Sequence, residues 1–289
     1  MKTKKMWIPI FLAPTLILFL LIYAIPLFMV FFTSLFDYRL YPNRFEFAGL
    51  QNYINLFSDQ RFLDGLVNTI VWIVMQCTLH VGLGVLLALI LYKKPFGWKF
   101  VRVSYMIPNI VSNAAIAMIF LNIFNPQFGV LNSILKSIGL ENLTRNWLFE
   151  NETAFMSVSL IWIMFAGYTT TLVLAEALSL DESVLEAAKI DGASNFQTDI
   201  FVVLPLIKKM IGTTMIMAAS YMLQMFDLVY ITTKGGPGNT TTSLPLLLYS
   251  VTTSENNYGY ANTIGVVIIV IGLISMTVIN KIFKMNKED

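Results

Sequence analysis

The sequence predicts an all-α integral membrane protein with six transmembrane helices. Hydrophobic residues make up 56% of the 289 residues, charged residues make up 12%, and the mean hydropathy is +0.70. A soluble domain usually carries about 25% charged residues. Six apolar windows are long enough to cross a bilayer, which takes roughly 20 residues. These windows are residues 7–35, 67–92, 103–124, 153–175, 210–233 and 258–280, and we expect them to form a single membrane domain over residues 1–289.

The first window is expected to be a permanent, bent helix. An apolar run that extends over residues 7–35 is far longer than the core of a secretory signal peptide, which is about 7–15 residues. Pro14 and Pro26 lie inside it and predict bending, because proline removes a backbone hydrogen bond. The other windows contain no formal charge, except that residues 210–233 include Asp227.

The distribution of basic residues predicts the orientation in the membrane. With the amino terminus inside, 13 of the 19 Lys and Arg residues, from Lys2 to Lys287, fall in cytoplasmic segments. Cytoplasmic loops of membrane proteins carry such an excess. We therefore expect a multi-pass protein of a bacterial plasma membrane with both termini in the cytoplasm. The net charge of +2 reflects this topology, and contact is expected with membrane lipid and not with nucleic acid.

Three longer segments are expected outside the membrane, at residues 36–66, 125–152 and 234–257. The third opens with KGGPGNTTTS, and this Gly-Gly-Pro-Gly run predicts a turn. The stretch LPLLLYSV that follows is too short to span a bilayer, so we expect a re-entrant or surface helix there.

A polar island at residues 179–209 interrupts the apolar windows and predicts a cytoplasmic hairpin of two short helices, joined at Asp191-Gly192. Ser179 with Glu182, and Ser194 with Gln197, have the spacing of capping boxes. An amphipathic connector lying on the membrane is one interpretation. Docking of a partner protein is favoured, because the island is acidic and helices that bind anionic lipid are usually basic. The expected apolar stripes are Val184, Leu185 and Ala188 in the first helix, and Phe196, Ile200 and Val203 in the second.

The island also resembles a known family. Glu186-Ala187-Ala188, then Gly192, then Val202-x-Leu204-Pro205 is similar to the "EAA" loop of permease subunits in bacterial binding-protein-dependent ABC importers. The visible departure is Val202, where isoleucine is usual. Further stretches resemble the maltose and oligosaccharide branch of that family, and the similarity covers nearly the whole chain. These stretches are LEAAKIDGAS, WLFENETA, YMIPN, FDLVYITTKGGPGNTT and NYGYA.

The resemblance implies a MetI-like permease of the type I importers, working by alternating access. It implies two cytoplasmic ATPase subunits that use ATP and Mg, a second homologous permease, and an extracellular sugar-binding protein. The loop around Glu186 would be the coupling helix that seats in the ATPase. The coupling positions implied are Glu186, Ala187, Ala188, Asp191, Gly192, Ala193, Leu204 and Pro205.

Catalytic chemistry is not expected in this chain. The sequence contains no G-x-x-x-x-G-K-[ST] phosphate loop, and its single histidine, His80, excludes an H-E-x-x-H zinc site. We therefore expect no bound cofactor. Asp227 is an intramembrane carboxylate, which marks a functional candidate by default. A structural role at the external vestibule or between helices is favoured. The amides Asn109, Asn113, Asn122 and Gln224 are expected to bond between helices.

A sugar pathway needs aromatic faces for pyranose rings together with uncharged hydrogen-bonding groups. Tyr168, beside three threonines, offers this in the fourth window, and Tyr221, Gln224 and Met225 share a helical face in the fifth. The resemblance to maltose-type permeases implies contacts at Tyr168, Tyr221, Met222 and Met225. Simple packing against neighbouring helices is the alternative for each residue.

Two alternative functions remain at the sequence level. A permease of the same family for another solute, such as a polyamine or a phosphate ester, would favour charged pathway residues, and Asp227 is the one candidate. A secondary carrier would favour inverted repeats and broken helices, and no convincing repeat is found.

Overall fold

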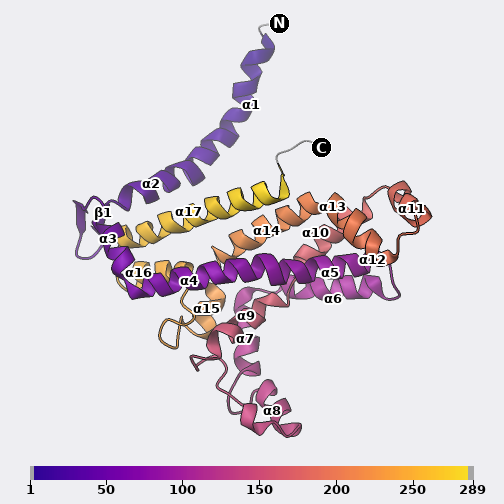
Figure 1. Ribbon diagram of the computed structural model, residues 1–289. Helices are drawn as coiled ribbons and strands as arrows, with labels where there is room; N and C mark the ends of the chain where they lie inside the picture. The colour runs from indigo at the N-terminus through magenta and orange to yellow at the C-terminus, as the bar shows by residue number, and fades with distance from the viewer. Residues whose placement is uncertain (1–2, 286–289) are drawn as a thin grey trace. The chain divides into compact units, whose positions relative to one another are not determined.

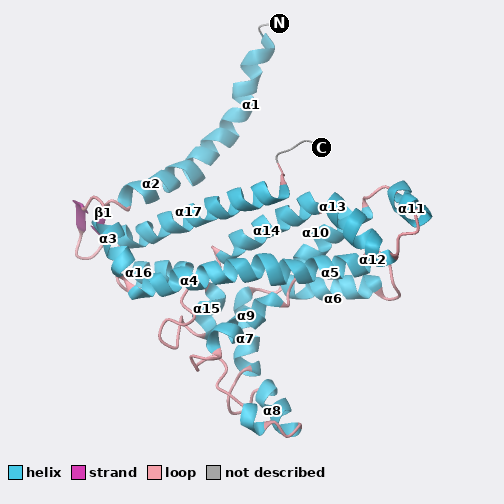
Figure 2. Cartoon of the chain, in the orientation of Figure 1, coloured by secondary structure: helices cyan, strands magenta, loops and turns pink. Residues whose placement is uncertain are grey.

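The computed structural model describes residues 3–285, with side chains from residue 11 onward, and is predominantly helical (Figures 1 and 2). Lys2 and Lys287, used in the topology argument, lie outside the described residues. By contacts the chain divides into two units. The first unit comprises residues up to 63 together with Leu247–Ile269, and the second comprises Asp64–Leu246 together with the residues from Val270.

The first unit holds the amino-terminal helix and a small β-hairpin. The apolar segment Phe11–Thr33 is long enough to span a membrane, and none of its most apolar stretch is buried. It continues through Pro14 and contains a π-helical turn directly before Pro26. The elements are α1 Thr3–Phe19, the π turn η1 Leu20–Ala24, α2 Ile25–Thr33, β1 Phe36–Arg39, β2 Arg44–Phe47 and α3 Gln51–Ser58, followed by the first residues of α4 Gln60–Met75 and parts of α16 Leu244–Thr253 and α17 Tyr258–Phe283.

The hairpin departs from the all-helical expectation. β1 and β2 pair antiparallel, with Phe36 opposite Phe47 and Arg39 opposite Arg44. Side chains alternate between the faces of a strand, so the charged residues fall on one face and the aromatic residues on the other. Phe36 stacks on Phe45 with ring centroids 4.5 Å apart. The alternation in FDYR and RFEF is the sequence signal for this hairpin.

In the described residues of the second unit, all regular secondary structure is helical. Besides the rest of α4, α16 and α17, it contains η2 Gln76–His80 (a π turn), α5 Val81–Leu91, α6 Trp98–Ile110, α7 Asn113–Ile123, α8 Val130–Ser137, the 3-10 turn η3 Glu141–Leu143, α9 Ala154–Ile163, α10 Gly167–Leu178, α11 Glu182–Ile190, α12 Asn195–Thr198, the π turn η4 Asp199–Val203, α13 Leu204–Leu206, α14 Lys208–Met222 and α15 Asp227–Thr232.

Four of the six predicted spans correspond to long apolar helical segments: Phe11–Thr33, Gln60–Leu91, Ala154–Leu178 and Tyr258–Phe283. The third predicted span is not one straight helix. It consists of Trp98–Ile110 and Asn113–Ile123, which meet at 99°. Lys208–Met222, which overlaps the fifth predicted span, forms a second bent pair with Asn195–Leu206, at 69°. Counting each bent pair as one span gives six among the described residues.

Local sequence explains where these spans break. Pro108 lies inside α6 and cannot donate a backbone hydrogen bond, and the helix ends two residues later. Ser112 then caps α7 by accepting a hydrogen bond from the Ala115 N–H at 3.3 Å. The fourth span is interrupted at residues 164–166, between α9 and Gly167 at the start of α10. The predicted fifth window is interrupted at residues 223–226, between α14 and α15.

Close helix packing defines the core of the second unit. Trp72, Val158, Ile161 and Leu228 are almost completely buried in one apolar cluster. Gly84 of α5 lets α10 approach, since a Cβ atom there would lie 2.6 Å from Thr169 Cγ2. Small residues at such crossings are typical of membrane helices. The predicted short helix after the Gly-Gly-Pro-Gly turn forms as α16, an apolar helix of ten residues.

Candidate functional site

A cavity of about 510 Å³ lies in the second unit at the helix breaks. We call it the helix-break cavity. Pro108, Val111 and Asn113 line it at the first break, and Phe165 and Tyr168 line it at the second. Tyr221, just before the third break, and Leu228, just after it, also belong to the lining. Broken helices expose backbone and re-aim side chains at membrane depth, and they are tolerated where they face a cavity.

Beside aliphatic residues, the lining contains aromatic and polar side chains without formal charge. The described residues that line the cavity include no Asp, Glu, Lys or Arg. Its hydrogen-bonding groups are amides, hydroxyls, an indole and an imidazole. The polar and aromatic lining residues are Gln76, His80, Asn109, Asn113, Trp162, Phe165, Tyr168, Thr169, Thr214 and Tyr221.

A polar chain connects the first and third breaks. The Tyr221 hydroxyl donates to Asn113 Oδ1 at 3.0 Å, and Asn113 Nδ2 donates to Asp227 Oδ1 at 3.4 Å. Asp227 Oδ1 also accepts from the backbone N–H of Leu228 at 2.9 Å. Asp227 therefore holds two broken helices together, as the structural interpretation expects. Of the four amides expected to bond between helices, Asn113 does so, whereas Asn109, Asn122 and Gln224 donate to carbonyls of their own helices.

The five predicted pathway residues occupy three different environments. Tyr168 and Tyr221 line the helix-break cavity. Met222 and Met225 are buried in the apolar core, with 2% and 3% of their surfaces exposed. Gln224 is exposed and donates to the Ser220 carbonyl at 3.1 Å. The single face expected for Tyr221, Gln224 and Met225 does not form, because α14 ends at Met222.

Sequence reasoning missed Gln76 and Trp162, two lining residues. His80, expected to be a packed side chain, is 8% exposed, and its Nδ1 lies 3.3 Å from the Trp162 carbonyl oxygen. Gln76 and His80 begin and end the π turn η2. Such turns frequently mark functional sites. A long polar side chain in the middle of a largely apolar span was the available signal for Gln76.

The predicted hairpin at the polar island forms, with one correction to its capping. Ser194 and Gln197 make the expected capping box. Ser179 does not cap α11: its hydroxyl donates to the Glu176 carbonyl, and Asp181 is the capping residue, accepting from the Ser183 N–H at 2.9 Å. That backbone hydrogen bond lowers the pKa of Asp181. Asp181 displaces Ser179 because its carboxylate lies next to the first helical turn.

We call residues 182–206 the helical hairpin. Gly192 adopts a φ of +79° after α11, as a residue that ends a helix often does, and this confirms the predicted Asp191-Gly192 junction. Leu185 and Leu204 pack against a second buried cluster, which joins α5, α10 and the hairpin. Of the expected coupling positions, Ala188, Ala193 and Leu204 are partly buried and the rest are exposed: Glu186, Ala187, Asp191, Gly192 and Pro205.

The helical hairpin presents large apolar side chains to its surroundings. Ile190 is 86% exposed, and Phe196 and Phe201 are each 73% exposed. Clustered exposed apolar residues next to polar ones mark interaction surfaces. Val184 and Ile200, from the expected stripes, are also exposed, whereas Val203 is buried. Each expected stripe therefore contains residues that pack inward and residues that are exposed on the surface.

A buried carboxylate fixes the helical hairpin to the end of α5. Asp199 is 8% exposed and accepts hydrogen bonds from the Tyr92 hydroxyl and from Lys93 Nζ, both at 2.5 Å. Charge-assisted hydrogen bonds of this kind are about twice as strong as neutral ones.

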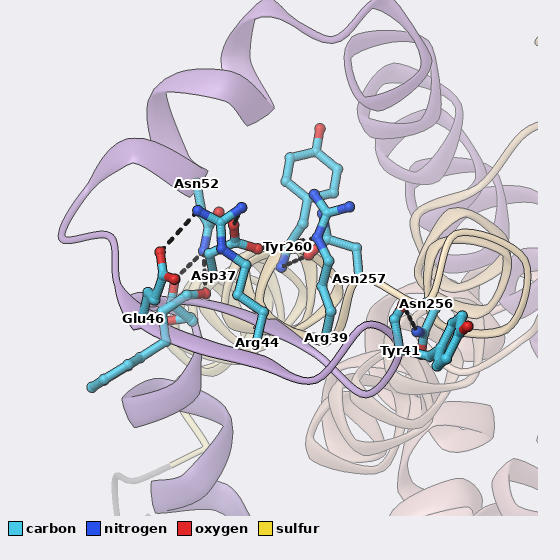
Figure 3. Close-up of polar contacts among 11 residues, drawn as sticks. Asp37, Arg39, Tyr41, Arg44, Glu46, Asn52, Asn256, Asn257 and Tyr260 are labelled. Carbon is cyan, nitrogen blue, oxygen red and sulfur yellow. Dashed lines mark hydrogen bonds and ion pairs between the residues drawn. The ribbon is translucent and has the colours of Figure 1, made fainter.

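A second cavity, of about 630 Å³, lies in the first unit on the charged face of the β-hairpin. Figure 3 shows polar contacts among residues there. We call it the ion-pair cavity. Arg44 pairs with Asp37 at 2.7 Å and with Glu46 at 2.8 Å. Arg61 likewise pairs with Asp59 at 2.8 Å. Asn256 ties the hairpin loop by donating to the Tyr41 carbonyl, and Glu255 Oε1 accepts from Arg61 Nη1. Each charged group named here therefore has an oppositely charged partner in the cavity.

The carboxyl group of Asp59 is stabilised in its ionised form. Partial burial raises the pKa of Asp59, but hydrogen bonds from Arg61 and Tyr260 lower it by more. The resulting pKa lies below the ordinary value of 3.8. The ionised carboxylate therefore contributes to the stability of the first unit.

Broken apolar spans around a central cavity are a feature of membrane transport proteins. Residues 80–285 match the family model described as the binding-protein-dependent transport system inner membrane component, and the chain belongs to this family. It is 34% identical to a probable ABC transporter permease protein, YurN, of Bacillus subtilis, over 97% of each chain. It is 32% identical to the multiple sugar-binding transport system permease protein MsmF of Streptococcus mutans, over 94% of each chain.

The fold also matches a solved structure. A chain from a bacterial ABC transporter involved in the import of the acidic polysaccharide alginate superposes with a TM-score of 0.85 at 20% identity, covering 99% of this chain and 98% of that one. This likeness supports the MetI-like permease fold. The protein is therefore a membrane-embedded permease component of an ABC importer.

Proposed function

We propose that this permease carries carbohydrates, and that they pass through the helix-break cavity. The observation that carries the proposal is the lining: aromatic faces beside uncharged amides and hydroxyls, without a formal charge among the described lining residues. Apolar faces of sugar rings pack on aromatic side chains, while neutral polar groups fix their orientation. The similarity to a permease named for multiple sugars supports the same substrate class.

Energy for transport enters through the helical hairpin in this proposal. Two partner ATPase subunits, using ATP and Mg, grip the exposed surface around Glu186 and Gly192 in the cytoplasm. With the helical hairpin in the cytoplasm, both termini lie there too. A second homologous permease completes the pathway, and an extracellular binding protein delivers the sugar. The exposed Ile190 and Phe196 support a protein partner at this surface, because large apolar side chains are enriched where proteins bind.

A polyamine or phosphate ester as cargo is less well supported. Either would leave its charge without a counter-charge among the described lining residues, and burying an unpaired charge is costly. A secondary carrier also uses broken helices at a central site, so the helix breaks do not separate the two classes. Membership of the family of binding-protein-dependent systems does.

Uptake by whole cells tests the proposal. A strain lacking its own copy of the gene, with the rest of the importer intact, is complemented with the chain and given labelled maltose, trehalose, raffinose, cellobiose and spermidine. We expect uptake of at least one sugar and none of spermidine. Tyr168→Ala should reduce that uptake severalfold without altering the amount of protein in the membrane. Uptake of spermidine alone would reject the carbohydrate assignment.

A further inference from the structure

We propose that Gln76 and Trp162 form a hydroxyl-binding subsite in the helix-break cavity, which selects uncharged, hydroxyl-rich cargo. The inference rests on the proposed function and names the chemistry of its substrate. Both side chains line the cavity, and each is 3% exposed. Gln76 Oε1 and Trp162 Nε1 are buried polar atoms for which the structure shows no hydrogen-bond partner.

Unpaired buried polar atoms are uncommon, because most buried polar groups are satisfied. The same pair of helices shows how a partner is normally supplied. About one turn away, the Trp72 indole donates to Ser159 Oγ at 2.8 Å. Trp72 does not belong to the cavity lining, whereas Trp162 does. The unpaired atoms therefore belong to side chains that border the cavity.

The backbone places both groups at the cavity. Gln76 opens the π turn η2, and His80 closes it. Residues four apart on a helix lie on the same face, and both Gln76 and His80 line the cavity. His80 Nδ1 lies 3.3 Å from the Trp162 carbonyl oxygen, which ties the turn to the end of α9.

The Trp162 indole N–H and the Gln76 carbonyl oxygen need opposite kinds of hydrogen-bonding partner. The Trp162 indole can only donate, and the Gln76 carbonyl oxygen can only accept. A hydroxyl group can fill both roles, because it donates its hydrogen to the Gln76 carbonyl oxygen and accepts from the Trp162 indole through its oxygen. An ammonium group could donate to Gln76 but could not accept from Trp162. A phosphate dianion could accept from Trp162 but could not donate to Gln76.

The absence of formal charge among the described lining residues also favours an uncharged cargo. The described lining residues supply no cation for a carboxylate or phosphate and no anion for an amine. Aromatic rings of Phe165 and Tyr168 belong to the same lining and provide apolar faces. The combination fits a neutral sugar and disfavours acidic sugars such as alginate fragments.

The test compares substrates within each variant, so that losses of folding or assembly cancel. Cells carrying the complete importer receive a saturating amount of the sugar transported in the uptake panel, or of one of its monodeoxy derivatives. The wild-type protein should move the parent sugar about threefold to tenfold faster than the derivative that lacks the recognised hydroxyl. In Gln76→Met and in Trp162→Phe this ratio should fall towards one.

Trp72→Phe is the matched control, because it removes an indole N–H from the same helix pair outside the cavity. It should keep the wild-type ratio even if less protein accumulates. An unchanged ratio in both lining variants, or no discrimination by the wild-type protein, would mean that water alone serves these groups and would overturn the subsite while leaving carbohydrate transport intact. If the wild-type protein moves no carbohydrate, the proposed function fails first. Gln76→Met and Trp162→Phe remove different groups, so either variant is sufficient if the other is not inserted.

Discussion

Asp199 and Lys93 form an ion pair at 2.5 Å that joins the helical hairpin to the end of α5. The Asp199 side chain is 12% exposed and the Lys93 side chain is 36% exposed. Tyr92 donates to the other carboxylate oxygen. These contacts fix the hairpin to α5, which itself packs on α10 of the cavity.

Asp199→Ala should destabilise the second unit. It removes two hydrogen bonds to a largely buried carboxylate, and bonds to charged groups contribute about 1.5–3 kcal/mol each. We expect a lower melting temperature of the purified importer in detergent. Lys93→Met should also lower the melting temperature, because it leaves the largely buried Asp199 carboxylate without its counter-charge. Lys136→Met, at an exposed position, serves as the control. Equal melting temperatures for all three variants would mean that the contacts of Asp199 do not stabilise the fold.

Glu186→Lys should uncouple ATP hydrolysis from transport. The side chain is exposed, so reversing its charge changes the docking surface and leaves the fold intact. We expect normal amounts of membrane protein, continued ATP hydrolysis and little uptake. Gly192→Asp should act similarly, because it adds a charge and strains the left-handed backbone at φ +79°. Glu141→Lys, in the 3-10 turn η3, is the control. Normal uptake by both hairpin variants would count against docking there.

Gly167→Ala should disturb the helix-break cavity. The added Cβ atom would lie 1.9 Å from the Tyr105 carbonyl oxygen, so α6 and α10 would have to separate. We expect reduced uptake and a lower melting temperature. Gly82→Ala in α5 is the matched control, since nothing lies within 4 Å of its Cβ position. Equal behaviour of the two variants would show that α6 and α10 need no close contact.

Acid should loosen the ion-pair cavity. The pKa of Asp59 in the folded protein lies below the ordinary value of 3.8, so ionised Asp59 stabilises the fold. That contribution is fully present above about pH 4 and is lost as the pH falls through the lower folded value. Hydrogen exchange of the amides in α3 should therefore accelerate at acid pH. In Asp59→Asn the exchange should already be fast at neutral pH and should vary less as acid is added, once corrected for intrinsic rates.

Hydropathy predicted the spans well but could not predict their breaks. It counts apolar residues, and residues 103–124 are apolar on both sides of the turn. The break depends on backbone hydrogen bonding, through Pro108 and the Ser112 cap. The β-hairpin was missed because alternation over four residues is a weak signal beside long apolar windows.

Two of the five predicted pathway residues lie at the cavity. Tyr168 and Tyr221 belong to helices that line it, and their role in a sugar pathway stays a prediction. Gln224 and Met225 follow the end of α14, where a 3.6-residue repeat no longer applies. Gln76 and Trp162 could not be paired from sequence, because their contact with one cavity depends on how α9 packs against the π turn. The coupling positions remain a prediction.

The helix breaks have a consequence for how such proteins diversify. Short unwound segments at residues 111–112, 164–166 and 223–226 lie at or beside the wall of the cavity, while long apolar helices elsewhere supply the hydrocarbon-compatible exterior. A few replacements at these segments can retune the choice of cargo and leave insertion into the bilayer unchanged. Specificity can thus drift quickly on a scaffold that itself stays constant.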